Sequence, residues 1–145
     1  MEAVNGRASA RLILSLDNIK NGKYMKFTEM DDAVTIFAQL EAEGGPVILI
    51  NKLSAVPSEM EQLLQAWAVD AAFMKRQPGF ISTQLHRGIA GSCVFINYAV
   101  WESAADFKRA FYQPEFQSHL KKYPPSAVAS PHLFTKVAVP GLCVA

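Results

Sequence analysis

The sequence predicts an α+β fold, in which one antiparallel sheet carries two helices. Apolar runs with the two-residue period of strands alternate with stretches of helical periodicity. Proline and glycine pairs separate these segments, so that their order is strand, helix, strand, strand, helix, strand.

The turn at Gly44-Gly45-Pro46 divides the chain into an N-terminal extension, residues 1–45, and a domain, residues 46–145. Within the extension, residues 11–16 predict a short strand. Residues 28–31 resemble a capping box for a helix that runs to about residue 43. The extension has no motif that carries chemistry, and we expect it to act as a cover or an interface element.

The first half of the domain predicts a strand followed by a long helix. Residues 47–55 form the strand, and the helix opens at residues 57–59 and ends at Pro78-Gly79. The apolar residues at helical spacing, which predict its buried stripe, are Met60, Leu63, Leu64, Trp67, Ala71 and Met74.

The second half predicts a hairpin, a second helix and a last strand. Residues 80–87 and 92–101 are strands joined through the turn at 88–91. Ser103 and Asp106 cap a helix, and Pro114 starts another that runs to about residue 122. The last strand is expected at residues 132–139. The complete order is the split βαβ arrangement of ferredoxin-like folds.

Both faces of the predicted sheet are apolar, although such a fold covers only one face with helices. The residues on the second face are Ile48, Ile50, Val94, Ile96 and Val100. A sheet that is apolar on both sides favours a second sheet packed against it, so we expect a homodimer.

Composition excludes several classes of function. The chain has 145 residues, 50% of them hydrophobic, and a net charge of +1, which gives no charge bias toward nucleic acid or an anionic membrane. No apolar run reaches the roughly 18 residues of a membrane helix, and no signal peptide is evident, so we expect a cytoplasmic protein. Cys93 and Cys143 are expected to be free thiols.

The familiar cofactor motifs are also missing from the sequence. It has no phosphate-binding or dinucleotide-binding glycine loop. The three histidines, His86, His119 and His132, have no carboxylate at metal-ligand spacing. We therefore expect neither a structural zinc nor a flavin bound by a Rossmann unit.

The candidate site consists of amides and an indole on two strands. Asn97 and Trp101 alternate onto one face of their strand, and Asn51 lies in the first strand. The first and third strands are neighbours in a split βαβ sheet, so Asn51 and Asn97 are expected to face one cavity under the helices. Taken singly, each asparagine is explained by a local hydrogen bond and Trp101 by core packing. Together they favour a binding site.

Four segments, in this order, resemble the antibiotic biosynthesis monooxygenase family: V-I-L-I-N-K-L-S-A, Q-P-G-F-I-S-T-Q-L-H-R, F-I-N-Y-A-V-W-E-S and F-Y-Q-P-E-F-Q-S-H-L. The resemblance covers residues 46–141 and implies a sheet-to-sheet dimer. One branch of this family oxidises anthrones and related phenols to quinones with O2, without metal or flavin. Its active sites are similar to Asn51, Asn97 and Trp101, including the Asn-x-x-x-Trp spacing.

The resemblance implies that the asparagines donate hydrogen bonds to an oxyanion and a peroxide, while Trp101 packs on the aromatic substrate. Candidates for the apolar wall are Trp67, Phe73, Phe107 and Phe111. No strong base is evident. His86 is the candidate proton acceptor, and its alternative explanation is an exposed strand histidine.

Three other functions stay open at the level of sequence. The first is haem binding or degradation, with His119 as axial ligand, although its spacing from Phe116 differs by one residue from the haem-degrading pattern. The second is a non-oxidative cyclase or isomerase of the same fold. The third is a binding module without turnover.

Overall fold

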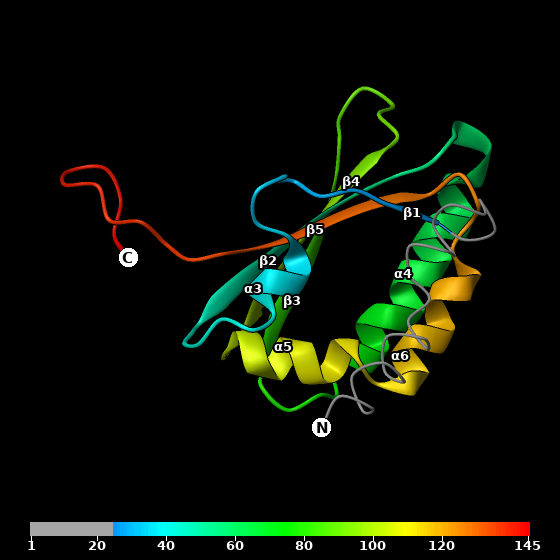
Figure 1. Ribbon diagram of the computed structural model, residues 1–145. Helices are drawn as coiled ribbons and strands as arrows, with labels where there is room; N and C mark the ends of the chain where they lie inside the picture. Colours follow the sequence, from blue (N-terminus) through cyan, green and yellow to red (C-terminus); the bar gives the residue numbers. More distant parts are fainter. Residues whose placement is uncertain (1–24) are drawn as a thin grey trace.

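A computed structural model describes residues 25–145, and Figure 1 shows one twisted sheet with the longer helices gathered on one side. The strands are β1 (Lys26–Phe27), β2 (Val47–Ser54), β3 (Phe80–Arg87), β4 (Val94–Trp101) and β5 (Val128–Phe134). The α-helices are α3 (Ile36–Gln39), α4 (Met60–Met74), α5 (Ala104–Phe111) and α6 (Pro114–His119). Two 3₁₀ helices, η1 (Pro57–Glu59) and η2 (Leu120–Lys122), precede α4 and follow α6. The predicted ferredoxin-like order of the domain is confirmed.

The sheet has the strand order β1-β5-β2-β4-β3, with β2 at its centre. Strand β2 pairs antiparallel with β4 on one side and with β5 on the other. Its register with β4 places Val47 opposite Trp101 and Asn51 opposite Asn97. The first and third strands of the domain are therefore neighbours, as the sequence predicts.

The predicted hairpin and helix cap are also observed. Strands β3 and β4 pair antiparallel across the turn, with one register irregularity between Phe80 and Ser82. Ser103 caps α5 by accepting a hydrogen bond from the Asp106 backbone N–H at 3.0 Å. Pro114 occupies the first turn of α6, where a missing N–H costs nothing.

The buried stripe of α4 differs from the predicted one. Leu64 is exposed and Trp67 is half-buried, whereas the buried residues of the helix are Met60, Leu63, Ala66, Asp70 and Phe73. The prediction assigned the apolar residues to the buried face of the helix, and it therefore did not include Asp70, the buried carboxyl group of α4. Asp70 occupies a core position that hydrophobic patterning assigns to an apolar residue.

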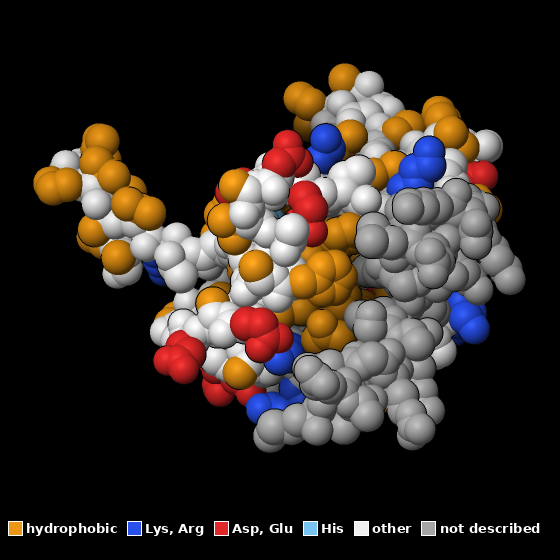
Figure 2. Space-filling view, viewed as in Figure 1, with side chains coloured by type: hydrophobic (Ala, Val, Ile, Leu, Met, Phe, Trp, Pro, Cys, Tyr) orange, Lys and Arg blue, Asp and Glu red, His pale blue; other side chains and the backbone are white. Residues whose placement is uncertain are grey.

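The last strand begins earlier than predicted, at Val128 rather than at residue 132, and ends at Phe134. Pro131 suggests a strand break in the sequence, but it lies on the part of β5 beyond its short pairing with β1. Proline is tolerated at such an outer edge because no ladder hydrogen bond is lost there. Beyond Phe134 the chain leaves the sheet as a tail, whose apolar side chains stand clear of the body (Figures 1 and 2).

The described part of the extension is folded onto the domain, although not as predicted. Residues 28–31 form no helix, and the only helical turn of residues 25–45 is α3, capped by Thr35. Strand β1, which the sequence did not predict, pairs parallel with β5. The strand predicted at residues 11–16 lies outside the described residues.

Helix α3 joins the core at the edge of β5. Ile36 and Leu40 are each 1% exposed, and the Phe37 ring lies 6.4 Å from the Phe111 ring of α5. The side-chain amide of Gln39 pairs with the Leu133 backbone as a neighbouring strand would. Its Nε2 donates to the Leu133 carbonyl at 2.9 Å, and its Oε1 accepts from the Leu133 N–H at 2.8 Å. This pairing covers an edge that would otherwise be open.

One face of the sheet forms the core with the helices, and the other is open. The core side includes Leu49, Leu53, Phe95 and Trp101, clustered with apolar residues of α4, α5 and α6. On the open face, Tyr98 is 39% and Phe134 is 41% exposed. The sheet is therefore apolar on both faces, as expected from the sequence.

We predict that Gln39→Ala lowers the free energy of unfolding by about 1–3 kcal/mol, because both Leu133 backbone groups lose their partner. Urea denaturation measures this change. Gln65→Ala on the exposed surface of α4 is the matched control and should change stability by less than about 0.5 kcal/mol. Equal effects of the two substitutions would show that the Gln39 pairing does not hold the extension on the domain.

Candidate active site

The candidate site is built around two asparagines that face each other across the centre of the sheet. Asn51 of β2 lies directly opposite Asn97 of β4, and both are partly buried. Asn51 lies two residues from the buried Leu49 and Leu53, and Asn97 lies two residues from the buried Phe95, so both point to the face that carries the helices. The sequence predicts this common face.

Each asparagine has its side-chain oxygen engaged by the protein. The Ser130 backbone N–H donates to Asn51 Oδ1 at 3.1 Å, and the Thr83 hydroxyl donates to Asn97 Oδ1 at 2.5 Å. Within residues 25–145 no hydrogen bond is recorded for either Nδ2 atom. Both amides are therefore oriented with their N–H groups available as donors.

Trp101 lies on the same face of β4 as Asn97, four residues further along the strand, and is part of the aromatic core. Its indole is 1% exposed, and it packs edge-on against Phe80 at 5.4 Å and tilted against Phe107 at 5.5 Å. Phe107 in turn contacts Phe111 at 6.0 Å. These three predicted residues, Trp101, Phe107 and Phe111, are thus brought together in one cluster on the helix side.

The other predicted residues are more scattered. Phe73 is buried and stacks on Phe116 at 6.2 Å, whereas Trp67 packs at the margin of the core. His86 does not join the asparagines: its strand partner is Ile96, on the open face, and its Nδ1 lies 3.3 Å from the Ile96 carbonyl oxygen. The structure therefore gives His86 the exposed strand position that was its alternative explanation.

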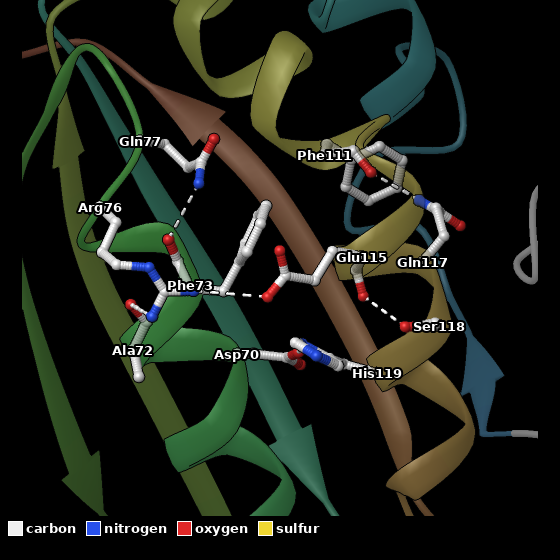
Figure 3. Close-up of polar contacts among 10 residues, drawn as sticks. All are labelled: Asp70, Ala72, Phe73, Arg76, Gln77, Phe111, Glu115, Gln117, Ser118 and His119. Atoms are coloured by element: carbon white, nitrogen blue, oxygen red, sulfur yellow. Dashed lines mark hydrogen bonds and ion pairs between the residues drawn. The ribbon is translucent and has the colours of Figure 1, made fainter.

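A polar cluster between α4 and α6 was missed by the sequence reasoning. Figure 3 shows Asp70 of α4 beside His119 of α6, and the Asp70 Oδ1 and His119 Nδ1 atoms lie 3.5 Å apart. The Tyr123 side chain hydrogen-bonds the Asp70 carboxyl group. An Asp at the helical spacing of Leu63, between apolar neighbours, is the signal that could have revealed this cluster.

Burial controls the ionisation of this cluster. It raises the pKa of Asp70 to about 7, against the opposing effects of the Tyr123 hydrogen bond and the Lys122 charge. Burial also lowers the pKa of His119 and raises that of Tyr123 well above its usual range. The close approach of Asp70 and His119 favours their charged forms and so opposes both burial effects. Asp70 is therefore partly protonated near neutral pH.

A separate pocket of about 250 Å³ lies where the extension meets the domain, lined by residues that include Gln39, Gly45, Ala104 and Phe134. None of the predicted site residues lines it. Among residues 25–145, no cluster of His, Cys, Asp or Glu side chains has the arrangement needed to hold a metal ion. The helices of this part are too short or too polar to span a membrane.

Comparison with known proteins identifies relatives of the chain. The family described as antibiotic biosynthesis monooxygenase matches residues 46–122. The deoxynogalonate monooxygenase of Streptomyces nogalater is 32% identical over 104 residues, which cover 72% of this chain and 76% of that enzyme. The tetracenomycin-F1 monooxygenase of Streptomyces glaucescens is 32% identical over 72 residues, or 49% of this chain and 63% of that enzyme.

Solved structures agree with these relatives. SnoaB, a cofactor-independent oxygenase from Streptomyces nogalater, superposes with a TM-score of 0.57 at 30% identity, covering 69% of this chain and 99% of its own. A monooxygenase-like protein from Caulobacter crescentus, 17% identical with a TM-score of 0.59, supports the fold alone. The matched domain, the two monooxygenase relatives and the shared fold show that this chain belongs to the antibiotic biosynthesis monooxygenase family.

Proposed function

We propose that the chain is a cofactor-independent monooxygenase that oxidises an electron-rich polycyclic phenol or anthrone-like substrate with O2 to a quinone or hydroxylated product. The observation that carries this proposal is the pair of opposed asparagines, whose oxygens are both held by protein donors. Such an arrangement presents amide N–H groups to a ligand on the helix side of the sheet. Fixed N–H donors stabilise an oxyanion without having to reorganise during the reaction.

The proposed reaction begins with a deprotonation and continues with the transfer of electrons from the substrate to O2. An anthrone loses a C–H proton, and the electron pair stays on the ring system as a delocalised anion. One electron passes to O2, the two radicals combine through a new C–O bond, and the resulting hydroperoxide loses water. One CH2 group and one O2 molecule thus give one C=O group and one H2O. Asn51 and Asn97 donate to the anion and the peroxide, and Trp101 with Phe107 supports the flat rings.

Freedom from a cofactor is supported by the description of SnoaB, which is 30% identical, as a cofactor-independent oxygenase. It also agrees with the reaction itself, because an electron-rich anion can reduce O2 directly. Two relatives are named as monooxygenases of deoxynogalonate and of tetracenomycin F1. They favour this class of substrate here without fixing its identity.

We predict that the chelator-treated protein, freed of metal and flavin, consumes O2 with dithranol in step with quinone formation. Asn97→Ala should lower kcat by about 10²-fold, the typical cost of one oxyanion donor, with little change in folding. An oxygen electrode measures the uptake of O2, and visible absorbance measures the formation of quinone. Gln84→Ala, an amide truncation on the opposite face of the same hairpin, is the control and should keep full activity.

No uptake above the protein-free rate would contradict the oxygenase proposal, and a haemin titration would then test the haem alternative. Equal losses of activity and stability in Asn97→Ala would indicate a structural role for this residue. Trp101→Phe adds a second comparison, although its burial makes some loss of stability inevitable.

We further predict that Thr83→Val lowers kcat by about tenfold while leaving KM for dithranol nearly unchanged. Loss of the Thr83 hydroxyl releases Asn97 Oδ1, so the amide no longer presents a fixed pair of N–H donors. Steady-state kinetics separates the two constants. A change confined to KM would instead assign Thr83 to substrate binding.

We also propose that the protein is a cytoplasmic homodimer joined through the open faces of its two sheets. Support comes from the apolar character of that face, where Ile50 pairs with Tyr98 and His132. Sedimentation velocity should give a dimer at micromolar concentration, and Ile50→Asp should yield monomers because it buries an unpaired charge. Ile89→Asp, in the exposed hairpin turn, should stay dimeric. A monomeric parent protein would contradict this proposal.

A further inference from the structure

The proposed reaction starts with the removal of a proton, but the asparagine pair offers no group that can accept one. Among the described residues, the groups in contact with it are the Thr83 hydroxyl and the Ser130 backbone N–H, and its neighbours on the same face, Leu49, Leu53 and Phe95, are apolar. None of these is a useful base near neutral pH. A proton acceptor for this site must come from another element that faces the same side of the sheet.

The positions of the three histidines leave one candidate. His86 and His132 have side chains on the open face, opposite Ile96 and Ile50 respectively. His119 lies on α6, on the helix side, with its ring edge-on to Phe73 at 6.1 Å. Phe73 belongs to the same core cluster as Trp101. His119 is thus the histidine that shares a layer with the asparagine pair.

His119 has a buried acidic neighbour. Asp70 is 6% exposed and occupies the core stripe of α4, one turn from Phe73. Its Oδ1 and the His119 Nδ1 are both fully buried and lie 3.5 Å apart, and within residues 25–145 neither atom makes a hydrogen bond. Tyr123 hydrogen-bonds the same carboxyl group. A buried polar pair between two helices is costly, so its presence calls for an explanation beyond packing.

We propose that His119 is the catalytic base of this enzyme, oriented by Asp70 as a positioning residue. This inference rests on the proposed function for the identity of the acid that His119 deprotonates. The Nδ1 atom faces Asp70, which leaves Nε2 as the nitrogen that meets the substrate. The buried carboxyl group holds the imidazole in one tautomer and supports the imidazolium, as the aspartate does in Ser-His-Asp triads.

With His119 as the base, every proton transfer of the proposed reaction has a donor and an acceptor. The substrate C–H or O–H bond breaks, its electron pair stays on the substrate, and the proton moves to His119 Nε2. After O2 has added, the imidazolium returns that proton to the peroxide, which gives a hydroperoxide. The second C–H bond on the same carbon then breaks, its electron pair forms the C=O bond as the O–O bond breaks, and the released hydroxide leaves with that proton as water. The electrons go from substrate to O2, and His119 ends the cycle neutral.

The charged groups around His119 favour the neutral imidazole that a base requires. Lys122 and Arg76 lower its pKa, whereas Glu115 raises it. Burial, the largest effect, also lowers this pKa. Among residues 25–145, Asp70 is the acidic group in contact with His119, and its own pKa of about 7 makes its charge depend on pH in the working range.

We predict that kcat/KM rises as pH increases through about 7, because Asp70 loses its proton there and its charge strengthens His119 as a base. Below this range Asp70 is neutral, and in more acidic solution His119 itself becomes protonated and inactive as a base. Asp70→Asn should remove the step near pH 7 and lower kcat, and His119→Gln should lower kcat by about 10²-fold. An unchanged pH profile in Asp70→Asn would contradict the positioning role.

The decisive test measures the pKa of a bound phenol that the enzyme cannot oxidise. The stable phenol 2-hydroxyanthraquinone changes its visible absorption when it ionises, so its apparent pKa can be titrated free and bound. The parent protein should lower this pKa by about one unit or more, a tenfold change in the ionisation equilibrium. In His119→Gln this shift should be clearly smaller, because only the asparagine N–H donors then favour the bound anion. His86→Gln, a matched change on the open face, should behave as the parent does.

Each outcome separates this inference from the proposed function. Dithranol oxidation that persists unchanged in His119→Gln overturns the base and leaves the oxygenase intact. A phenol pKa that His119 controls, in a protein without oxygenase activity, keeps the proton acceptor and rejects the oxygenase. A phenol that does not bind, or whose pKa is the same in the parent and His119→Gln, overturns the inference. Circular dichroism and urea unfolding check that both variants are folded.

Discussion

The antiparallel register of β2 with β4 is the constraint on which the candidate site depends. It sets Asn51 directly opposite Asn97 and, four residues further along β4, Trp101 opposite Val47. Because side chains alternate with a period of two, a slip of one residue would send one amide to the open face. The register is fixed by Leu49, Leu53 and Phe95, which are buried only in this alignment. Core packing therefore also determines the geometry of the amide pair.

In helix α4, by contrast, a carboxyl group occupies a position where packing alone favours an apolar residue. Asp70 lies in the stripe between Ala66 and Phe73, and burial keeps it partly protonated near neutral pH. An unpaired ionised carboxylate in that position would be far more costly. Tyr123 and His119 reduce the cost by contacting the group from the neighbouring α6 and η2 segment. The interface between the helices thus contains a titratable group in place of an apolar contact.

The sequence predicts the domain well where local patterns and tertiary packing agree. Alternating strands, the Ser103 cap and the adjacency of the two central strands need only periodicity and a known topology. It fails where tertiary context overrides a local signal. Pro131 indicates a break in the sequence, but the strand continues through it because its position on the outer edge needs no backbone N–H. Asp70 is polar, so the periodicity of apolar residues does not predict the observed buried stripe of α4. The Gln39 pairing with Leu133 joins residues from two parts of the chain, so no local pattern predicts it.

The two halves of the proposed chemistry come from different layers of the fold. The sheet supplies fixed N–H donors, since Ser130 and Thr83 hold the oxygens of the two amides. The helices supply the titratable pair of Asp70 and His119. Donors and an acceptor on a single strand would pair with each other and lose their reactivity, because a buried base beside an amide N–H accepts its hydrogen bond. In the proposed mechanism, the sheet therefore contributes the oxyanion donors and the helices contribute the base.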